Sequence, residues 1–232
     1  MSDHNTRSER ALRAAEAMLA HLHPKEDASG LTRMLAEHFG SADAMCRADP
    51  HMLEALGVHP HDALLLNRLP ELARLTQRSH FDRFPMLGTL ADASEYLTAA
   101  FHGLQVERFY LFCLDARGRL REQVLLQDGT VDTALFDLRG LLAEAVRTRA
   151  DAVLISHNHP GLTMRPSNAD IQSTVDAIHA LTAVGIPLLD HVIVAGDRAV
   201  SMRDGGFIRA SLWLNQHVNH PLLVNWLAEE SS

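Results

Sequence analysis

The sequence predicts an α/β protein in which a mixed sheet flanked by helices is preceded by a small all-helical domain. Two observations support this fold class. From about residue 8 to 78 the apolar residues recur at helical spacing, and no strand-like run occurs. From about residue 88 to 210, amphipathic helical segments alternate with short apolar runs, which is the pattern of a sheet covered by helices. We therefore expect a helical domain over residues 1–80, a sheet domain over 88–210 and a C-terminal tail over 211–232 with one weak helix.

Four helices are expected in the first region. Apolar residues on a single face predict the first helix, and Pro24 ends it. The second covers residues 31–39, and the third begins at the capping pair Asp49-Pro50. The fourth covers about 62–77, and its expected apolar positions are Leu65, Leu69, Leu72 and Leu75.

A linker and then an alternation of helices and strands follow. Residues 79–87 contain Pro85 and no periodicity, as expected of a linker. The run at 109–114 is apolar at every position, which indicates an interior strand buried on both faces. The expected helices are 89–102, 138–148 and 167–183, and the expected strands are 109–114, 120–126, 152–155, 186–189, 191–195 and 199–202.

Composition places the chain among ordinary globular proteins, with 47% hydrophobic and 22% charged residues. No run of 18 apolar residues occurs, so we expect no membrane span, and the polar N-terminus lacks the apolar core of a signal peptide. Only Cys46 and Cys113 are present, which indicates a reducing compartment and excludes a cysteine-based zinc cage. We expect a cytoplasmic protein.

The charge balance argues against nucleic acid as a partner. The formal net charge is −8, from 29 acidic and 21 basic residues, and the single lysine is Lys25. Proteins that bind nucleic acid gain much of their affinity by neutralising phosphates with clustered basic residues. No such cluster occurs in this sequence, although a local arginine patch is left open.

A pair of histidines and an aspartate stand out in residues 155–170. The expected strand at 152–155 leads into His157 and His159, which point to the same side if the chain stays extended. Asp170 falls in the first turn of the helix that opens at Ser167. Two histidines and one carboxylate without a thiolate are typical of catalytic zinc, where the fourth position is left for a water whose pKa falls to about 7.

Two other interpretations of these residues are open from spacing alone. The same ligand set also serves iron in oxygen chemistry. Alternatively, Ser167-x-x-Asp170 is close to a helix capping box, and the two histidines are ordinary loop residues. The combination of both halves at the end of a buried strand favours a metal site.

The pattern H-x-H-P, five residues, P-S-x-x-D resembles the JAMM (MPN-plus) metalloprotease motif, and the bacterial RadC-like branch is the closer match. The resemblance covers about residues 88–208. Two residue pairs differ from the usual pattern of the branch. Gly161-Leu162 replaces the usual Ser-Gly, and Arg139-Gly140 replaces the usual Arg-Glu. Both changes can alter the substrate groove. Further matching segments are Glu107-x-Phe109, Leu114-Asp115, Gly129-Thr130-Val131, Arg139, the run 186–194, Ser201 and Gly206.

This resemblance implies a JAB/MPN-like (cytidine-deaminase-like) fold and a role for each matching residue. His157, His159 and Asp170 match the zinc ligands of the family. Ser167 matches the serine that hydrogen-bonds the developing oxyanion, and Glu107 matches the glutamate that holds the water and moves protons. Asp190 and His191 also match family positions, where we expect them to support the ligands from behind or to fill the core.

The helical half resembles the helix-hairpin-helix module of the same branch only faintly. The expected Gly-hydrophobic-Gly turn is present as Gly57-Val58-His59, without its second glycine. A histidine in place of glycine hinders the close approach of backbone to phosphate that such turns use. DNA binding by this half is therefore not expected.

These observations lead to one functional hypothesis and one alternative. The first is a cytoplasmic Zn²⁺-dependent metalloprotease, a hydrolase that cleaves a peptide or isopeptide bond of a protein or peptide substrate with Glu107 as general base. The alternative is a non-catalytic zinc-binding scaffold or a DNA-binding protein associated with DNA repair. No membrane partner is expected, and a homodimer is left open.

Overall fold

The computed structural model describes residues 2–79, 81, 83–129, 136–216 and 220–228. The chain divides into two compact units, Met1–Ala73 and Arg74–Ser232. The boundary falls within one helix, α5 (Pro60–Arg78). Thr130 and Val131, which the family resemblance singled out, lie outside the described residues.

The first unit consists of helices, and three of them are capped at their N-termini by local side chains. After α1 (Ser2–Leu22) come α2 (Ala28–Phe39), α3 (Ala42–Arg47) and α4 (Pro50–Ala55), followed by the first part of α5. The Asp49 carboxylate accepts a hydrogen bond from the His51 amide (2.8 Å) and so caps α4. The buried core of the unit is formed by Ala15, Leu35, Met45, Leu53, Val58, Ala63 and Leu66.

Two expectations for this unit were wrong. Helix α3 was not predicted, because its six residues are too few to show a helical period. On α5, Leu65, Leu72 and Leu75 are 41%, 60% and 51% exposed, whereas Leu66 is fully buried. The run of three leucines at 64–66 fits more than one helical face, so apolar spacing alone does not decide which face is buried.

The second unit is built on a five-stranded mixed sheet. Its strands are β1 (Arg108–Leu114), β2 (Leu120–Asp128), β3 (Ala152–Asn158), β4 (Leu188–Ala195) and β5 (Arg198–Ser201). They lie in the order β2-β1-β3-β4-β5, in which β3 and β4 are parallel and the other neighbours antiparallel. A parallel pair requires a crossover, and α8 (Asn168–Ala183) provides it.

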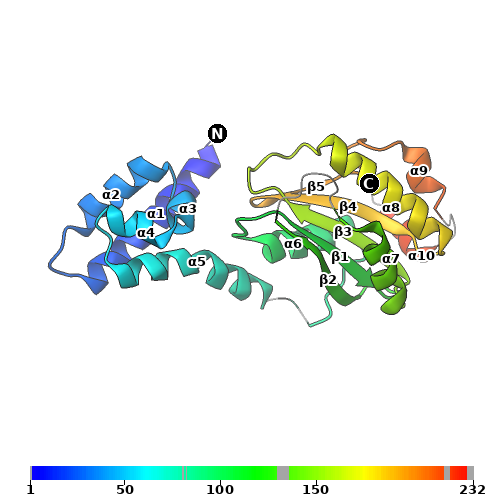
Figure 1. Cartoon of the computed structure of the whole chain (residues 1–232), viewed down its shortest axis with the longest axis horizontal. Coiled ribbons are helices and arrows are strands. Elements are labelled where there is room, and N and C mark those ends of the chain that lie inside the picture. Colours follow the sequence, from blue (N-terminus) through cyan, green and yellow to red (C-terminus); the bar gives the residue numbers. More distant parts are fainter. Residues whose placement is uncertain (1, 80, 82, 130–135, 217–219, 229–232) are drawn as a thin grey trace. The chain divides into compact units, whose positions relative to one another are not determined.

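Helices cover both faces of this sheet. One face packs against α7 (Leu138–Arg147), α8 and α9 (Ala210–Leu214), and the other against α6 (Leu90–Phe101) and α10 (Pro221–Ala228) (Figure 1). Along β1, Phe109 and Leu111 lie in the first core while Phe112 lies in the second. This two-sided burial explains why the strand is apolar at every position. The predicted mixed sheet flanked by helices is confirmed.

Three element predictions for the second unit were incomplete. The strands expected at 186–189 and 191–195 are one strand, β4, because the Asp190 carboxylate is buried with hydrogen-bond donors around it. The strand expected at 152–155 continues to Asn158 and so includes the first histidine of the motif. The tail holds two helices, α9 and α10, in place of the single weak helix expected.

Within the described residues, none of the helices combines the length and apolarity that crossing a bilayer needs.

Candidate metal centre

The end of β3 directs the first histidine of the motif towards the α8 side of the sheet. Val153 and Ile155 lie in the core on that side, and the alternation of the strand places His157 on the same face. His157 is fully buried, paired with Phe109 of β1 and Ile193 of β4. The Phe109 ring stacks on the His157 imidazole, with 4.2 Å between ring centroids and 12° between planes.

The N-terminus of α8 brings the aspartate to the same place. Ser167 is the N-cap and Asp170 the third helical residue, and their bonds are reciprocal: the Ser167 amide donates to Asp170 Oδ2 (2.6 Å) and the Asp170 amide donates to Ser167 Oγ (3.1 Å). This is a capping box, as the structural interpretation of the sequence supposed. The Asp170 carboxylate is nevertheless 1% exposed, and its Oδ1 accepts no hydrogen bond within the described part of the chain.

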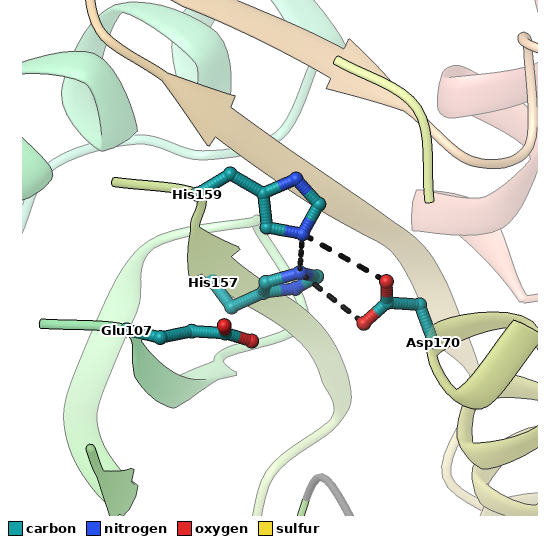
Figure 2. Close-up of side chains that lie close together, drawn as sticks. All are labelled: Glu107, His157, His159 and Asp170. Atoms are coloured by element: carbon teal, nitrogen blue, oxygen red, sulfur yellow. Dashed lines mark hydrogen bonds and ion pairs between the residues drawn. The ribbon is translucent and has the colours of Figure 1, made fainter. Parts of the chain in front are cut away.

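Four side chains converge at this point (Figure 2). The Nε2 atoms of His157 and His159 are 2.8 Å apart. Asp170 Oδ1 lies 3.3 Å from His157 Nε2, and Asp170 Oδ2 lies 3.8 Å from His159 Nε2. With the Glu107 carboxylate added, one ligand atom from each of the four side chains lies within 4.8 Å of all the others.

These residues fit a divalent metal ion. His159 Nδ1 lies 2.8 Å from the Thr163 carbonyl oxygen, which only accepts, so Nδ1 carries the proton and Nε2 of the neutral ring presents a lone pair to the site. That lone pair faces His157 Nε2, which in turn lies beside Asp170 Oδ1, and a cation among these three atoms satisfies all of them. Two imidazole nitrogens and a carboxylate without a thiolate are typical of a catalytic site for zinc or another divalent transition metal.

The charge states follow from burial and from these contacts. Burial lowers the pKa of His157 well below its usual value, and the neighbouring His159 lowers it further, so His157 is neutral. Burial alone would lower the pKa of His159, but its contacts with Asp170 and Thr163 outweigh that effect and raise it. Burial alone would raise the pKa of Asp170, but its interactions with His159 and Ser167 lower it, so the carboxylate is ionised.

Glu107 lies immediately before β1, and its backbone is held by the side chain of Asn158. The Arg108 amide donates to Asn158 Oδ1 (2.9 Å), and Asn158 Nδ2 donates to the Val106 carbonyl (3.0 Å). The Glu107 carboxylate therefore points to the space beside His157 (Figure 2). Partial burial raises the pKa of Glu107, and nearby Asp170 raises it further.

Asp190 and His191, which were expected to support the ligands from behind, differ in whether they contact a candidate ligand. His191 Nε2 lies 2.8 Å from His157 Nδ1, so it contacts a candidate ligand directly. Asp190 does not, because its carboxylate accepts hydrogen bonds from the His191 amide (2.7 Å), the Ser201 hydroxyl and the Arg203 amide. Asp190 thus connects β4 with the last residue of β5 and with the backbone that follows it, and burial raises its pKa to about 7.

Sequence reasoning assigned no role at the site to four residues that the structure places around the candidate ligands, although Phe109 was among the positions that match the family: Thr163, Asn158, Phe109 and Thr174. Of these only Thr174 left a signal, since it follows Asp170 by four residues and so lies on the same face of α8. The contacts of the other three depend on strand register and loop conformation, which spacing does not reveal.

Comparison with known proteins agrees with this geometry. The family model described as RadC-like JAB domain matches residues 87–207, a segment that contains all four converging side chains. The chain belongs to this family.

A UPF0758 protein of Shewanella oneidensis is 31% identical over 183 residues, covering 78% of this chain and 81% of the relative. A UPF0758 protein of Thiobacillus denitrificans is 32% identical over 184 residues, covering 79% and 82%. The name of these RadC-like JAB relatives states no activity.

Proposed function

We propose that this RadC-like JAB protein is a zinc-dependent peptidase or isopeptidase. The observation that carries the proposal is the position of Glu107, whose carboxylate lies within 4.8 Å of the three candidate ligands. Three protein ligands leave the fourth position of a catalytic zinc ion to water, and a carboxylate beside that position can accept a proton from the water. JAB domains are often metallohydrolases, which supports the same class of reaction.

In this proposal His157, His159 and Asp170 hold the ion, and Glu107 moves protons. Bound zinc would act as a Lewis acid and lower the pKa of water to about 7. A Glu107 carboxylate oxygen accepts a proton from the attacking water and then donates it to the nitrogen of the leaving amine. Burial assists both steps, because the raised pKa of Glu107 brings it closer to the neutral pH at which a group both accepts and donates well.

In this proposal the Ser167 hydroxyl donates a hydrogen bond to the developing oxyanion. Its Oγ accepts from the Asp170 amide, and this bond leaves the hydroxyl proton available to a substrate oxygen. Ser167 is exposed at the start of α8, where the positive end of the helix dipole also favours negative charge. Cap and oxyanion donor are therefore compatible roles for this residue.

Glu107→Gln tests the proposal, because glutamine keeps the shape of the side chain and cannot accept the proton. We expect bound zinc to be unchanged and hydrolysis of a peptide and isopeptide panel to fall by roughly 10²–10⁴-fold. Glu95→Gln on α6, an exposed glutamate that is not among the four converging side chains, is the matched control and should keep wild-type rates. Full zinc-dependent hydrolysis by Glu107→Gln would refute the role of Glu107.

A further inference from the structure

Thr174 of α8 lies at the start of a buried chain of hydrogen bonds that ends at a candidate ligand. It is fully buried, one helical turn after Asp170. Its Oγ1 lies 2.6 Å from the backbone carbonyl oxygen of Asp170 and 2.6 Å from Nδ1 of His191. His191 Nε2 in turn lies 2.8 Å from Nδ1 of His157. The chain therefore connects the backbone of one ligand with the ring of another.

The Asp170 carbonyl fixes the direction of the first bond. A carbonyl oxygen only accepts, so at 2.6 Å the Thr174 hydroxyl must donate to it. The sulfur of Met202, 3.7 Å from Oγ1, is a more distant and weaker acceptor. Because a hydroxyl has a single proton, Thr174 Oγ1 can only accept from His191. Nδ1 of His191 must then carry a proton.

The positions of the protons on the His191 and His157 rings follow from this bond direction. The His191 ring is fully buried, and its described contacts are to the Thr174 hydroxyl, the His157 ring and the Phe109 ring. No carboxylate among the described residues contacts the ring directly, so burial keeps it neutral. A neutral ring protonated at Nδ1 has a lone pair at Nε2. His157 Nδ1 must therefore donate to His191 Nε2. In neutral His157 this leaves Nε2 unprotonated, facing His159 and Asp170.

We infer that Thr174 is a positioning residue that sets the tautomer of His157 through His191, so that His157 Nε2 is free to bind a metal ion. The inference rests on the metal site of the proposed function. Without the hydroxyl, the proton of His191 can move to Nε2 and donate to His157 Nδ1, which puts the proton of His157 on the nitrogen that must coordinate. Groups that orient a ligating histidine typically change metal affinity by 10–100-fold when removed.

The tautomer can be measured directly in metal-free protein. In ¹⁵N NMR of histidine-labelled protein, protonated and unprotonated ring nitrogens have distinct chemical shifts, and a His157→Gln variant assigns the signals of His157. We expect wild-type protein to carry the proton of His157 on Nδ1. A proton on Nε2 in wild-type protein would overturn the inference, whatever the variants do.

Three variants then test the role of the hydroxyl, with zinc affinity measured by competition with a chromophoric chelator. Thr174→Val should weaken zinc binding about tenfold or more and shift protonation of His157 towards Nε2. Thr174→Ser keeps the hydroxyl and should restore both properties. Thr98→Val is the matched control, because it removes the same kind of hydroxyl-to-carbonyl bond within α6 (Thr98 Oγ1 to the Ser94 carbonyl, 2.9 Å) without touching a histidine.

The outcomes separate this inference from the proposed function. If Thr174→Val binds zinc and protonates His157 as the wild type does, Thr174 has no positioning role. If wild-type protein binds no zinc, the metal site fails, while the wild-type NMR spectrum still decides the tautomer. If Thr174→Val does not fold, the wild-type spectrum and the Thr174→Ser variant carry the test, and a changed tautomer in Thr174→Ser would contradict it.

Discussion

At the scale of single residues, neighbouring groups hold the candidate ligands and Glu107 in place. The Thr163 carbonyl orients the His159 ring, and the Asn158 side chain holds the backbone on both sides of Glu107. Asp170 is held by the first turn of its own helix. Such preorganisation lowers the cost of bringing ligands together, which is why contacts behind a metal site affect its affinity.

The buried carboxyl group of Asp190 predicts how the free energy of unfolding depends on pH. Burial raises its pKa to about 7 in the folded protein, whereas the unfolded chain releases the proton near 3.8. Between these values the native state binds more protons, so the contribution of Asp190 to stability is complete below about pH 4 and is lost as the pH rises through about 7. This loss is at most about 4 kcal/mol, since one pKa unit corresponds to about 1.4 kcal/mol.

Urea unfolding of chelator-treated protein at about pH 4 and about pH 8 measures this effect. Asp190→Asn should show a smaller loss of unfolding free energy between the two pH values than the wild type, because its amide does not ionise. All other titrating groups are shared by the two proteins. Equal losses would mean that Asp190 ionises as easily in the folded as in the unfolded state.

The sequence indicates which single residues can meet where the chain itself sets the geometry. Spacing along a strand and into a helix was enough to bring His157, His159 and Asp170 together as candidates, and the structure places their ligand atoms next to one another. Asn158 could not be assigned a role in this way, because its partners Val106 and Arg108 lie about fifty residues away in the sequence.

At the scale of elements, the N-terminus of α8 combines helix capping with the proposed chemistry. Ser167→Ala should lower the unfolding free energy by about 1 kcal/mol through loss of the cap. It should also lower hydrolysis by about 10²-fold or more, as expected when an oxyanion donor is lost. Urea unfolding and steady-state rates measure the two effects separately.

Thr89→Ala is the matched control, since Thr89 caps α6 with the same bond, from the Asp92 amide at 3.1 Å. It should cost a similar free energy of unfolding and leave the rate unchanged. If both variants keep wild-type rates, Ser167 is a cap alone.

Some helices and strands were predicted from the sequence pattern, whereas the extent of β4 was not. The helices and strands around the motif were predicted because their apolar periods are long and their caps local, as with Ser167 and Thr89. Strand β4 was divided in two because Asp190-His191 interrupts its apolar run. That pair is tolerated inside the sheet because its side chains find hydrogen-bond partners in neighbouring elements, among them Ser201 and Thr174.

At the scale of the whole molecule, the charge of −8 predicts no affinity for DNA. In a gel-shift assay with duplex DNA we expect no retarded band even at about 50 mM salt, because phosphate binding requires clustered positive charge. A retarded band that weakens steeply as salt rises would instead support the DNA-binding alternative. A band that does not respond to salt would also contradict this expectation.

The central claim is that His157, His159 and Asp170 hold a metal ion, and metal content by mass spectrometry tests it most directly. Untagged wild-type protein should contain about one zinc ion per chain, as a single three-ligand site requires, and a folded His157→Ala, His159→Ala double variant should contain none. Well-folded wild-type protein without metal, even after zinc is added back, would contradict the account.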